Sequence, residues 1–123
     1  MEISLERAGR FRATTMRPND HKCASMKTRV YPWEVRIEGT DAHLTPEGFL
    51  INNEFIGEYF EERWGRKAKP WDAVSCEMLA IISAKEICAQ LIKQGVSVQK
   101  VLCRIKGSNN AWVSAECVPG DVN

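Results

Sequence analysis

The residues best suited to chemistry gather in one polar segment in the first third of the chain. Cys23 is the cysteine with polar neighbours, which are His21, Lys22, Lys27 and Arg29. A thiol becomes a nucleophile when a base or a positive field lowers its pKa. The segment therefore makes Cys23 a candidate nucleophile, and the alternative that we favour is a polar loop without chemistry.

Donors for a metal ion are scarce. His21 and Cys23 could bind one together with His43, but turn-forming surface histidines explain this pattern better. The five cysteines show no C-x-x-C spacing, and their odd number does not suggest a disulfide framework. The chain also lacks phosphate-binding glycine motifs and a Ser/His/Asp candidate. We therefore expect neither a metal nor a cofactor.

The four tryptophans are numerous for this length. Trp64 and Trp71 bracket the basic stretch 66–69, an arrangement that could stack and neutralise a nucleotide or a single strand. The interpretation that we favour is a helix end followed by a solvated loop. Trp33 and Trp112 fall on predicted strands, where we expect them in the core or in a subunit interface.

Changes in hydrophobic period predict the elements that must position these residues. Trp33, Val35 and Ile37 alternate with charged residues, as in a strand with one buried face. Asn52 or Asn53 can begin a helix that ends at Gly65. The predicted strands are 10–13, 30–38, 48–51, 101–106 and 111–115, with a hairpin of 30–38 and 48–51; the predicted helices are 54–64 and 75–94, separated by a loop over 66–73. This order predicts an α+β fold, with an antiparallel sheet and both helices on one face.

Composition is that of one folded domain, residues 1–123. The chain has 44% hydrophobic and 27% charged residues and a net charge of +1, so a protein built around nucleic acid is not expected. It contains neither a membrane-spanning apolar run nor a signal-peptide core, so we expect a cytoplasmic protein. Acids cluster over 37–62 and bases over 63–106. These blocks could meet across a subunit contact, although we favour solvated faces.

At the level of motifs, the chain resembles the 6-pyruvoyl-tetrahydropterin synthase and 6-carboxytetrahydropterin synthase family. The similarity covers roughly residues 10–115 and rests on the shared order of several short segments. These are Phe11-Arg12-Ala13-Thr14-Thr15, His21-Lys22-Cys23, Trp33-Glu34-Val35-Arg36-Ile37-Glu38-Gly39, Glu47-Gly48-Phe49-Leu50-Ile51-Asn52 and Val74-Ser75-Cys76-Glu77. The resemblance implies the tunnelling fold (T-fold), a four-stranded ββααββ domain that assembles into homo-oligomers with the active-site cleft between subunits.

The departures from the family pattern concern its chemistry. The resemblance implies three zinc-binding histidines, and the matching positions hold Thr15, Lys27 and Arg29. It also implies an Asp-His pair between the helices, where only Asp72 is present, and a pterin-anchoring glutamate where Lys106 or Gly107 stands. Lysine cannot accept the paired N–H donors of a pterin edge. Of the catalytic elements, only Cys23 is retained.

The sequence therefore predicts a zinc-free, non-catalytic relative, a pseudoenzyme that acts as an oligomeric binding or scaffold protein. An anionic or purine-like small molecule would bind near Lys27, Arg29, Glu77 and Lys106. One alternative is a divergent zinc-independent enzyme that uses Cys23 on a pterin-like substrate. Another is a protein that binds a macromolecular partner through its charge blocks.

Overall fold

The computed structural model describes residues 1–16, 26–48, 51, 53–69, 71–72, 74–107 and 110–122. For Thr15, Met16, Met26, Lys27 and His43 this description covers the backbone alone.

A long antiparallel hairpin forms the centre of the sheet. β1 (Glu2–Met16) and β2 (Met26–Thr40) pair along their whole length, from Glu2 opposite Thr40 to Met16 opposite Met26. β4 (Lys100–Lys106) pairs with β2, and β5 (Trp112–Cys117) pairs with β4. β3 (Trp71–Asp72) adds a two-residue parallel strand beside the end of β1. The sheet order is β3-β1-β2-β4-β5, so the predicted four-stranded antiparallel sheet is confirmed and β3 extends it.

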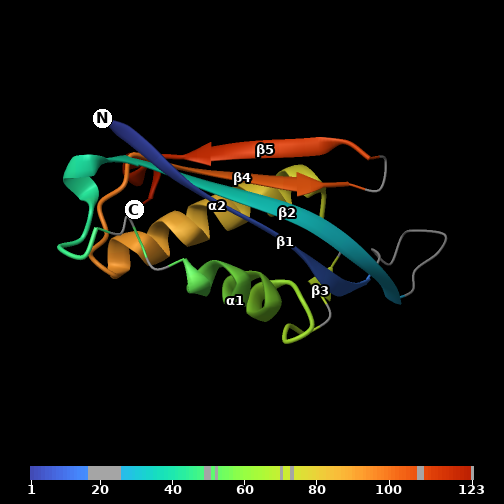
Figure 1. Ribbon diagram of the computed structural model, residues 1–123. Coiled ribbons are helices and arrows are strands. Elements are labelled where there is room, and N and C mark those ends of the chain that lie inside the picture. The colour runs from blue at the N-terminus through green and yellow to red at the C-terminus, as the bar shows by residue number, and fades with distance from the viewer. Residues whose placement is uncertain are drawn as a thin grey trace.

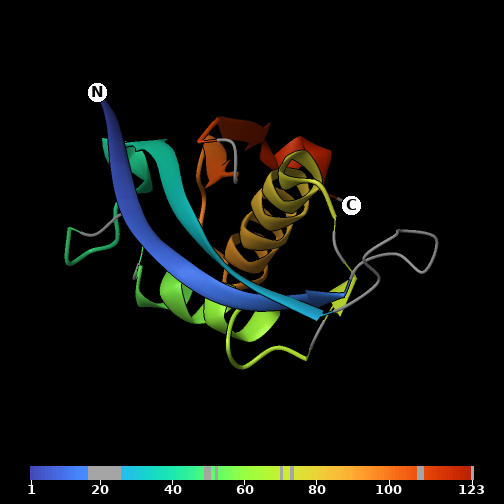
Figure 2. The same ribbon diagram turned by 90° about the vertical axis from the view of Figure 1, so that its right-hand side faces the viewer.

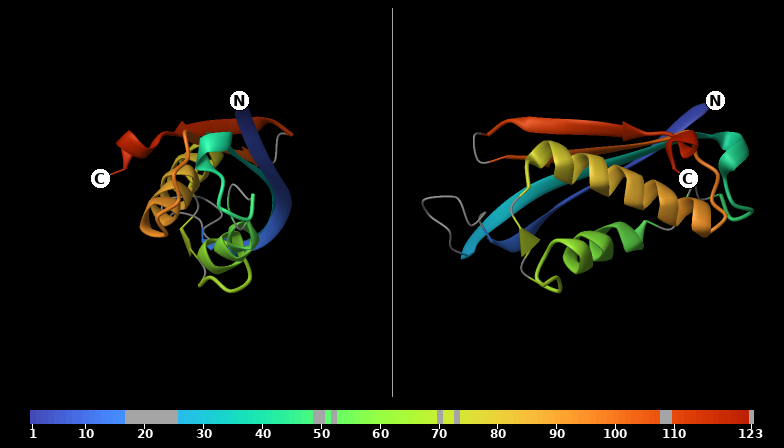
Figure 3. Two further views of the ribbon diagram at one scale, coloured as in Figure 1. Left: turned by 60° about the vertical axis from the view of Figure 1, so that its left-hand side comes forward. Right: turned by 180° about the vertical axis from the view of Figure 1, so that it is seen from behind.

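Two helices cover one face of this sheet (Figure 1). α1 (Glu54–Arg63) lies beneath the strongly curved β1, and α2 (Cys76–Lys93) runs along the concave side of the sheet (Figure 2). Seen from behind, the helices lie side by side with the strands behind them (Figure 3). The Tyr59 hydroxyl on α1 donates a hydrogen bond of 2.6 Å to Glu86 on α2, which joins the two helices.

Alternation along β2 places its large apolar side chains under the helices. Trp33, Val35 and Ile37 are buried, and the Trp33 ring stacks on Phe60 of α1 with 4.3 Å between centroids. Gly9 lies opposite Trp33, and a Cβ at this position would stand 2.6 Å from an indole carbon. A residue without a side chain therefore lets the indole cross β1. The order of burial in β2 follows the period-two pattern of the sequence.

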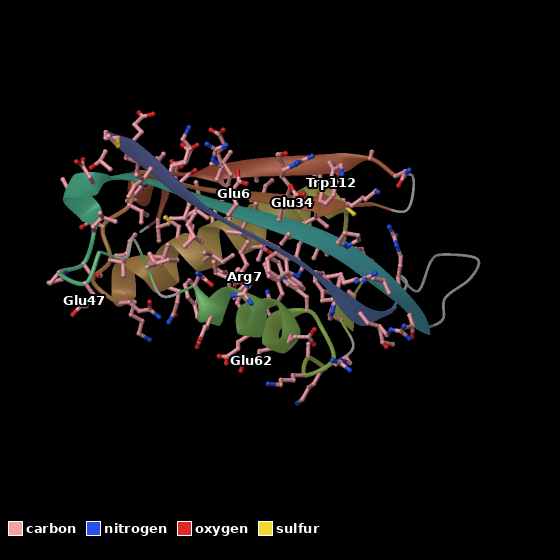
Figure 4. All side chains as sticks on the ribbon, in the orientation of Figure 1. Glu6, Arg7, Glu34, Glu47, Glu62 and Trp112 are labelled. Carbon is pink, nitrogen blue, oxygen red and sulfur yellow. The ribbon has the colours of Figure 1, made fainter. Side chains whose placement is uncertain are left out.

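The helix-free face of the sheet is charged. Figure 4 shows Glu6, Glu34 and Trp112 on this side, whereas Arg7 points from β1 toward the start of α1. Arg7 donates to the backbone oxygen (3.0 Å) and to Oδ1 (2.8 Å) of Asn53. Asn53 precedes α1 as predicted, but its side chain makes no capping hydrogen bond with the helix because it binds Arg7 instead.

Three sequence-based expectations for this part of the fold are wrong. The predicted hairpin of 30–38 with 48–51 does not form, because β1 and β4 occupy both edges of β2 over residues 33–38. Ile51 is buried outside any strand, and residues 49 and 50 lie outside the described part. The first strand begins at Glu2, far before the predicted residue 10, and a short strand, β3, interrupts the predicted loop over 66–73.

Candidate functional site

The hairpin end of the sheet brings together a cation, a phenol and a tryptophan. Arg29, near the start of β2, places its guanidinium 4.7 Å from the ring centroid of Tyr31. Tyr31 in turn stacks on Phe11, with 5.1 Å between centroids, and lies 6.4 Å from Trp71 of β3. Tyr31 is buried, whereas Arg29 and Trp71 are partly exposed. A cationic side chain is thus held against an aromatic wall at a partly open end of the core.

The first turn of α2 adds a thiol to this group. Ser75 caps the helix, since its hydroxyl accepts a hydrogen bond of 3.1 Å from the Met78 backbone N–H. Cys76 begins the helix and is partly buried. Burial raises the pKa of the Cys76 thiol; the charge of Arg29 opposes this rise, and the charge of Glu77 adds to it. Near neutral pH the thiol is therefore protonated and is a weak nucleophile.

The same arginine acts on the phenol. Burial raises the pKa of Tyr31, while Arg29 lowers it and Cys76 adds a smaller rise. Arg29, Tyr31 and Cys76 therefore lie within electrostatic reach of one another, across β2 and the start of α2. We call these three residues with Trp71 the Arg29 site. It can bind an anion against an aromatic surface, and it holds no group poised for acid–base chemistry near neutral pH.

The three positions that the sequence resemblance assigns to zinc ligands, Thr15, Lys27 and Arg29, do not fit this ion. Thr15 pairs with Lys27 in the β1–β2 ladder, and Arg29 pairs with Ala13 two residues further along. Zinc in proteins is bound by imidazole, thiolate or carboxylate. Lysine and arginine side chains carry positive charge and offer no lone pair to the ion. Within the described ranges, His, Cys, Asp and Glu form no group of three that could hold a metal.

The predicted ligand-binding residues do not form a single group. Arg29 is central to the site above, and Glu77 is exposed on the first turn of α2 beside Cys76. Lys106 lies on the opposite, helix-free face of the sheet, where its Nζ is 5.8 Å from the ring centroid of Trp112. Cys23 and His21 lie outside the described residues, as does the side chain of Lys27.

The two tryptophans beside the basic loop are structural. The Trp64 indole is buried and donates a hydrogen bond of 3.1 Å to Ser83 Oγ. The Trp71 indole donates a hydrogen bond of 2.9 Å to the Trp64 carbonyl. The rings meet edge to face at 5.0 Å. They pack against each other and do not offer parallel faces for bases, which agrees with the favoured interpretation of a helix end and a loop. His43, the third donor of the weak metal hypothesis, lies in the short helix η1 (Asp41–His43).

Comparison with known proteins identifies the fold. No family model matches the chain, and no curated protein is similar to it in sequence. The 6-pyruvoyl tetrahydropterin synthase from Plasmodium vivax matches it with a TM-score of 0.66 at 8% identity, over 96% of this chain and 99% of the synthase. The chain has the fold of these synthases.

Two more solved structures agree. A catalytic-residue mutant of the same Plasmodium vivax synthase matches with a TM-score of 0.62 at 11% identity, over 96% of this chain and 99% of its own. The Plasmodium falciparum synthase matches with a TM-score of 0.56 at 10% identity, over 96% and 98% of the two chains. The tunnelling fold expected from the sequence is confirmed. Because the sequence identity is low, the similarity shows a shared fold and nothing more. No helix among the described residues has the length and apolar character needed to cross a membrane.

Sequence analysis missed Cys76 and Tyr31 as members of the site. Cys76 falls in the apolar stripe of its helix and reads as core. Its signal was the segment Val74-Ser75-Cys76-Glu77, one of the segments on which the family resemblance rests. Tyr31 lies two positions from Arg29 on β2. The pairing of β1 with β2 places Tyr31 opposite Phe11, and this pairing was not predicted along its full length.

Proposed function

We propose that this chain is a zinc-free, non-catalytic binding protein on the pterin-synthase fold, and that it binds a small anionic or purine-like molecule at the Arg29 site. One observation carries the proposal: the partly exposed guanidinium of Arg29 packs on the ring of Tyr31. Arg29 has no ion pair with any residue that the structure describes. Its charge is therefore open to a ligand, and the partly exposed Trp71 supplies aromatic surface beside it.

The acting form is a homo-oligomer. β5 pairs on one side only, with β4, and β1 has β2 as its sole partner except at Thr15 and Met16, among the described strands. Open strand edges favour pairing with another chain unless they are covered. Pairing of copies through the edge of β5 would cover that edge in the assembly.

Calorimetric titration tests the binding proposal. Pterin, guanosine monophosphate and inorganic phosphate are the probes, and Arg29→Gln is the variant that removes the charge. We expect at least one probe to bind saturably and about tenfold more weakly to Arg29→Gln, which corresponds to the loss of one charged hydrogen bond. Arg36→Gln is the matched control, because Arg36 is also on β2 but already pairs with Glu38 at 3.2 Å. Absence of binding by every probe contradicts the proposal.

A further inference from the structure

A cavity opens where the free edge of β1 meets the end of α1. It has a volume of about 460 Å³ and is lined by the side chains or backbone of six residues: Arg10, Phe11, Arg12, Val30, Glu61 and Arg66. We call it the arginine cavity. Its volume falls within the range of small-molecule pockets, about 300–1,000 Å³. Half of the lining residues are arginines, so the cavity differs in character from an ordinary surface depression.

Two of these arginines come from β1 and are free of carboxylates. Arg10 and Arg12 are two positions apart on one strand, so both project to the helix-free side, and both are exposed. Neither forms an ion pair within the described part of the chain. Arg36 on the same face lies 3.6 Å from Glu6 and 3.2 Å from Glu38. Unpaired charge is thus a local property of Arg10 and Arg12, not of the whole face.

The third arginine is held in place by the turn after α1. The Glu61 carboxylate accepts a hydrogen bond of 3.3 Å from the Arg66 backbone N–H and lies 3.7 Å from Arg66 Nε. The Glu61 carbonyl accepts a hydrogen bond of 3.0 Å from the Lys67 backbone N–H. Gly65 permits this tight return, since a Cβ there would stand 2.9 Å from Glu61 Cα. Glu61 therefore fixes the loop that presents Arg66 to the cavity.

The charge of the lining defines the ligand class. Three of the lining residues carry a guanidinium group and one carries a carboxylate, which gives the lining an excess of two positive charges. Planar guanidinium groups bind phosphate oxygens with paired hydrogen bonds, and a phosphate monoester carries nearly two negative charges near neutral pH. Val30 is 40% exposed and offers apolar contact for the organic part of the molecule. We propose that the arginine cavity binds a small phosphate monoester. This site is separate from the Arg29 site, which lies on the helix-covered side of the sheet.

Titration of the full chain with phenyl phosphate tests this assignment. Phenyl phosphate supplies the dianion and an apolar ring, and benzenesulfonate serves as the monoanionic comparison. We expect saturable binding of phenyl phosphate that is tighter than that of benzenesulfonate. Each of the substitutions Arg10→Ala and Arg12→Ala should weaken it about tenfold or more, the effect of losing a charged hydrogen bond. Arg36→Ala, on the same face but already paired, should change it less than about twofold.

Other outcomes would overturn the proposal. One is that the unchanged chain shows no saturable binding of phenyl phosphate. The other is that Arg36→Ala weakens binding as much as the β1 variants do, which would mean that general surface charge attracts the ligand. Both β1 arginines are exposed, so the variants should keep the melting temperature of the parent, and this is checked on the same samples. Arg29→Gln should leave phenyl phosphate binding at the arginine cavity intact. The two binding proposals can therefore fail independently.

Discussion

At the scale of single residues, Gly9 and Trp33 show how a side chain that is absent shapes the core. The indole of Trp33 fills the space over Gly9, and it stacks on Phe60 below. This contact anchors α1 to the hairpin through one aromatic residue. Substitutions at Gly9 should therefore act on the packing of α1, although Gly9 itself is on the surface.

Replacement Gly9→Ala should lower the free energy of unfolding by about 1–3 kcal/mol, the usual cost of overpacking. The added Cβ would meet the indole at 2.6 Å, and the buried ring has little room to move. Urea unfolding measures the loss. Gly120→Ala is the matched control, because a Cβ there meets nothing within 4 Å, and it should change stability by less than about 0.5 kcal/mol. Equal losses in the two variants would contradict this account of Gly9.

Thiol labelling of the native chain separates the cysteines by their surroundings. Burial raises the pKa of Cys103 to about 12 and that of Cys88 to about 11, the latter with a contribution from Cys117. Both are fully buried, so we expect no labelling near neutral pH. Cys76 should label more slowly than free cysteine, because its pKa is also raised. Mass spectrometry of the labelled peptides reads out each site.

The same experiment addresses the alternative in which Cys23 is a nucleophile. A Cys23 that reacts no faster than free cysteine agrees with a non-catalytic protein. A Cys23 that reacts much faster near neutral pH would support the zinc-independent enzyme instead. Denatured chain is the control, since all five cysteines should then react alike.

The face of the sheet on which a strand residue lies can be predicted from local alternation. Arg29 shares the parity of Tyr31 and Trp33, so its place on the helix-covered side follows from the strand pattern. Lys106 alternates with the buried Ile105, and the same rule would have placed it on the other face, away from Arg29. The family resemblance placed Arg29 and Lys106 in one site, whereas strand alternation places them on opposite faces of the sheet. The arginine cavity could not be predicted, because its walls come from strand and helix end brought together by the fold.

At the scale of elements, the second helix was the easiest to predict. Its signals are local: Ser75 as N-cap, an apolar stripe, and Gly95, which has a φ of +75° just beyond the C-terminus. The β1–β2 pairing depends on contacts between distant residues, such as Glu2 with Thr40. The first strand has mixed polar residues on its helix-free face, and its start carries only Ile3 and Leu5 as inward apolar signals. The hairpin with 48–51 was predicted because two apolar runs flank a turn, and period alone does not choose the partner of a strand.

Removal of the cap by Ser75→Ala should lower the free energy of unfolding by about 1 kcal/mol. The reason is that the Met78 backbone N–H loses its 3.1 Å acceptor at the start of α2. Ser97→Ala is the control, since Ser97 is exposed in the loop after the helix. Chemical denaturation of both variants provides the comparison. If Ser75→Ala were as stable as Ser97→Ala, the cap would not contribute.

At the scale of the whole molecule, the stability of the chain should depend on alkaline pH through its buried thiols. In the unfolded chain a cysteine ionises near pH 9, whereas Cys103 stays protonated in the fold up to about pH 12. Between these values the unfolded state binds fewer protons, so stability falls as pH rises, by up to about 1.4 kcal/mol per pH unit for each such group. Below the unfolded pKa this group has no effect on the pH dependence.

Urea unfolding of the parent and of Cys103→Ala from about pH 8 to about pH 10.5 measures this slope. The variant is less stable at every pH because it leaves a small cavity, so the difference in slope is the readout. We expect the variant to lose stability less steeply above about pH 9. Parallel curves would show that Cys103 does not keep its proton in the folded chain.

The chain has the synthase fold, and we propose that it binds no zinc. This proposal is tested most directly by elemental analysis of protein purified without chelator, with the mass in solution determined on the same sample. We expect an oligomer with far less than one zinc per chain, because threonine, lysine and arginine stand at the positions that the resemblance assigns to zinc ligands. About one zinc per chain would contradict the proposal and would return zinc-dependent chemistry to this fold.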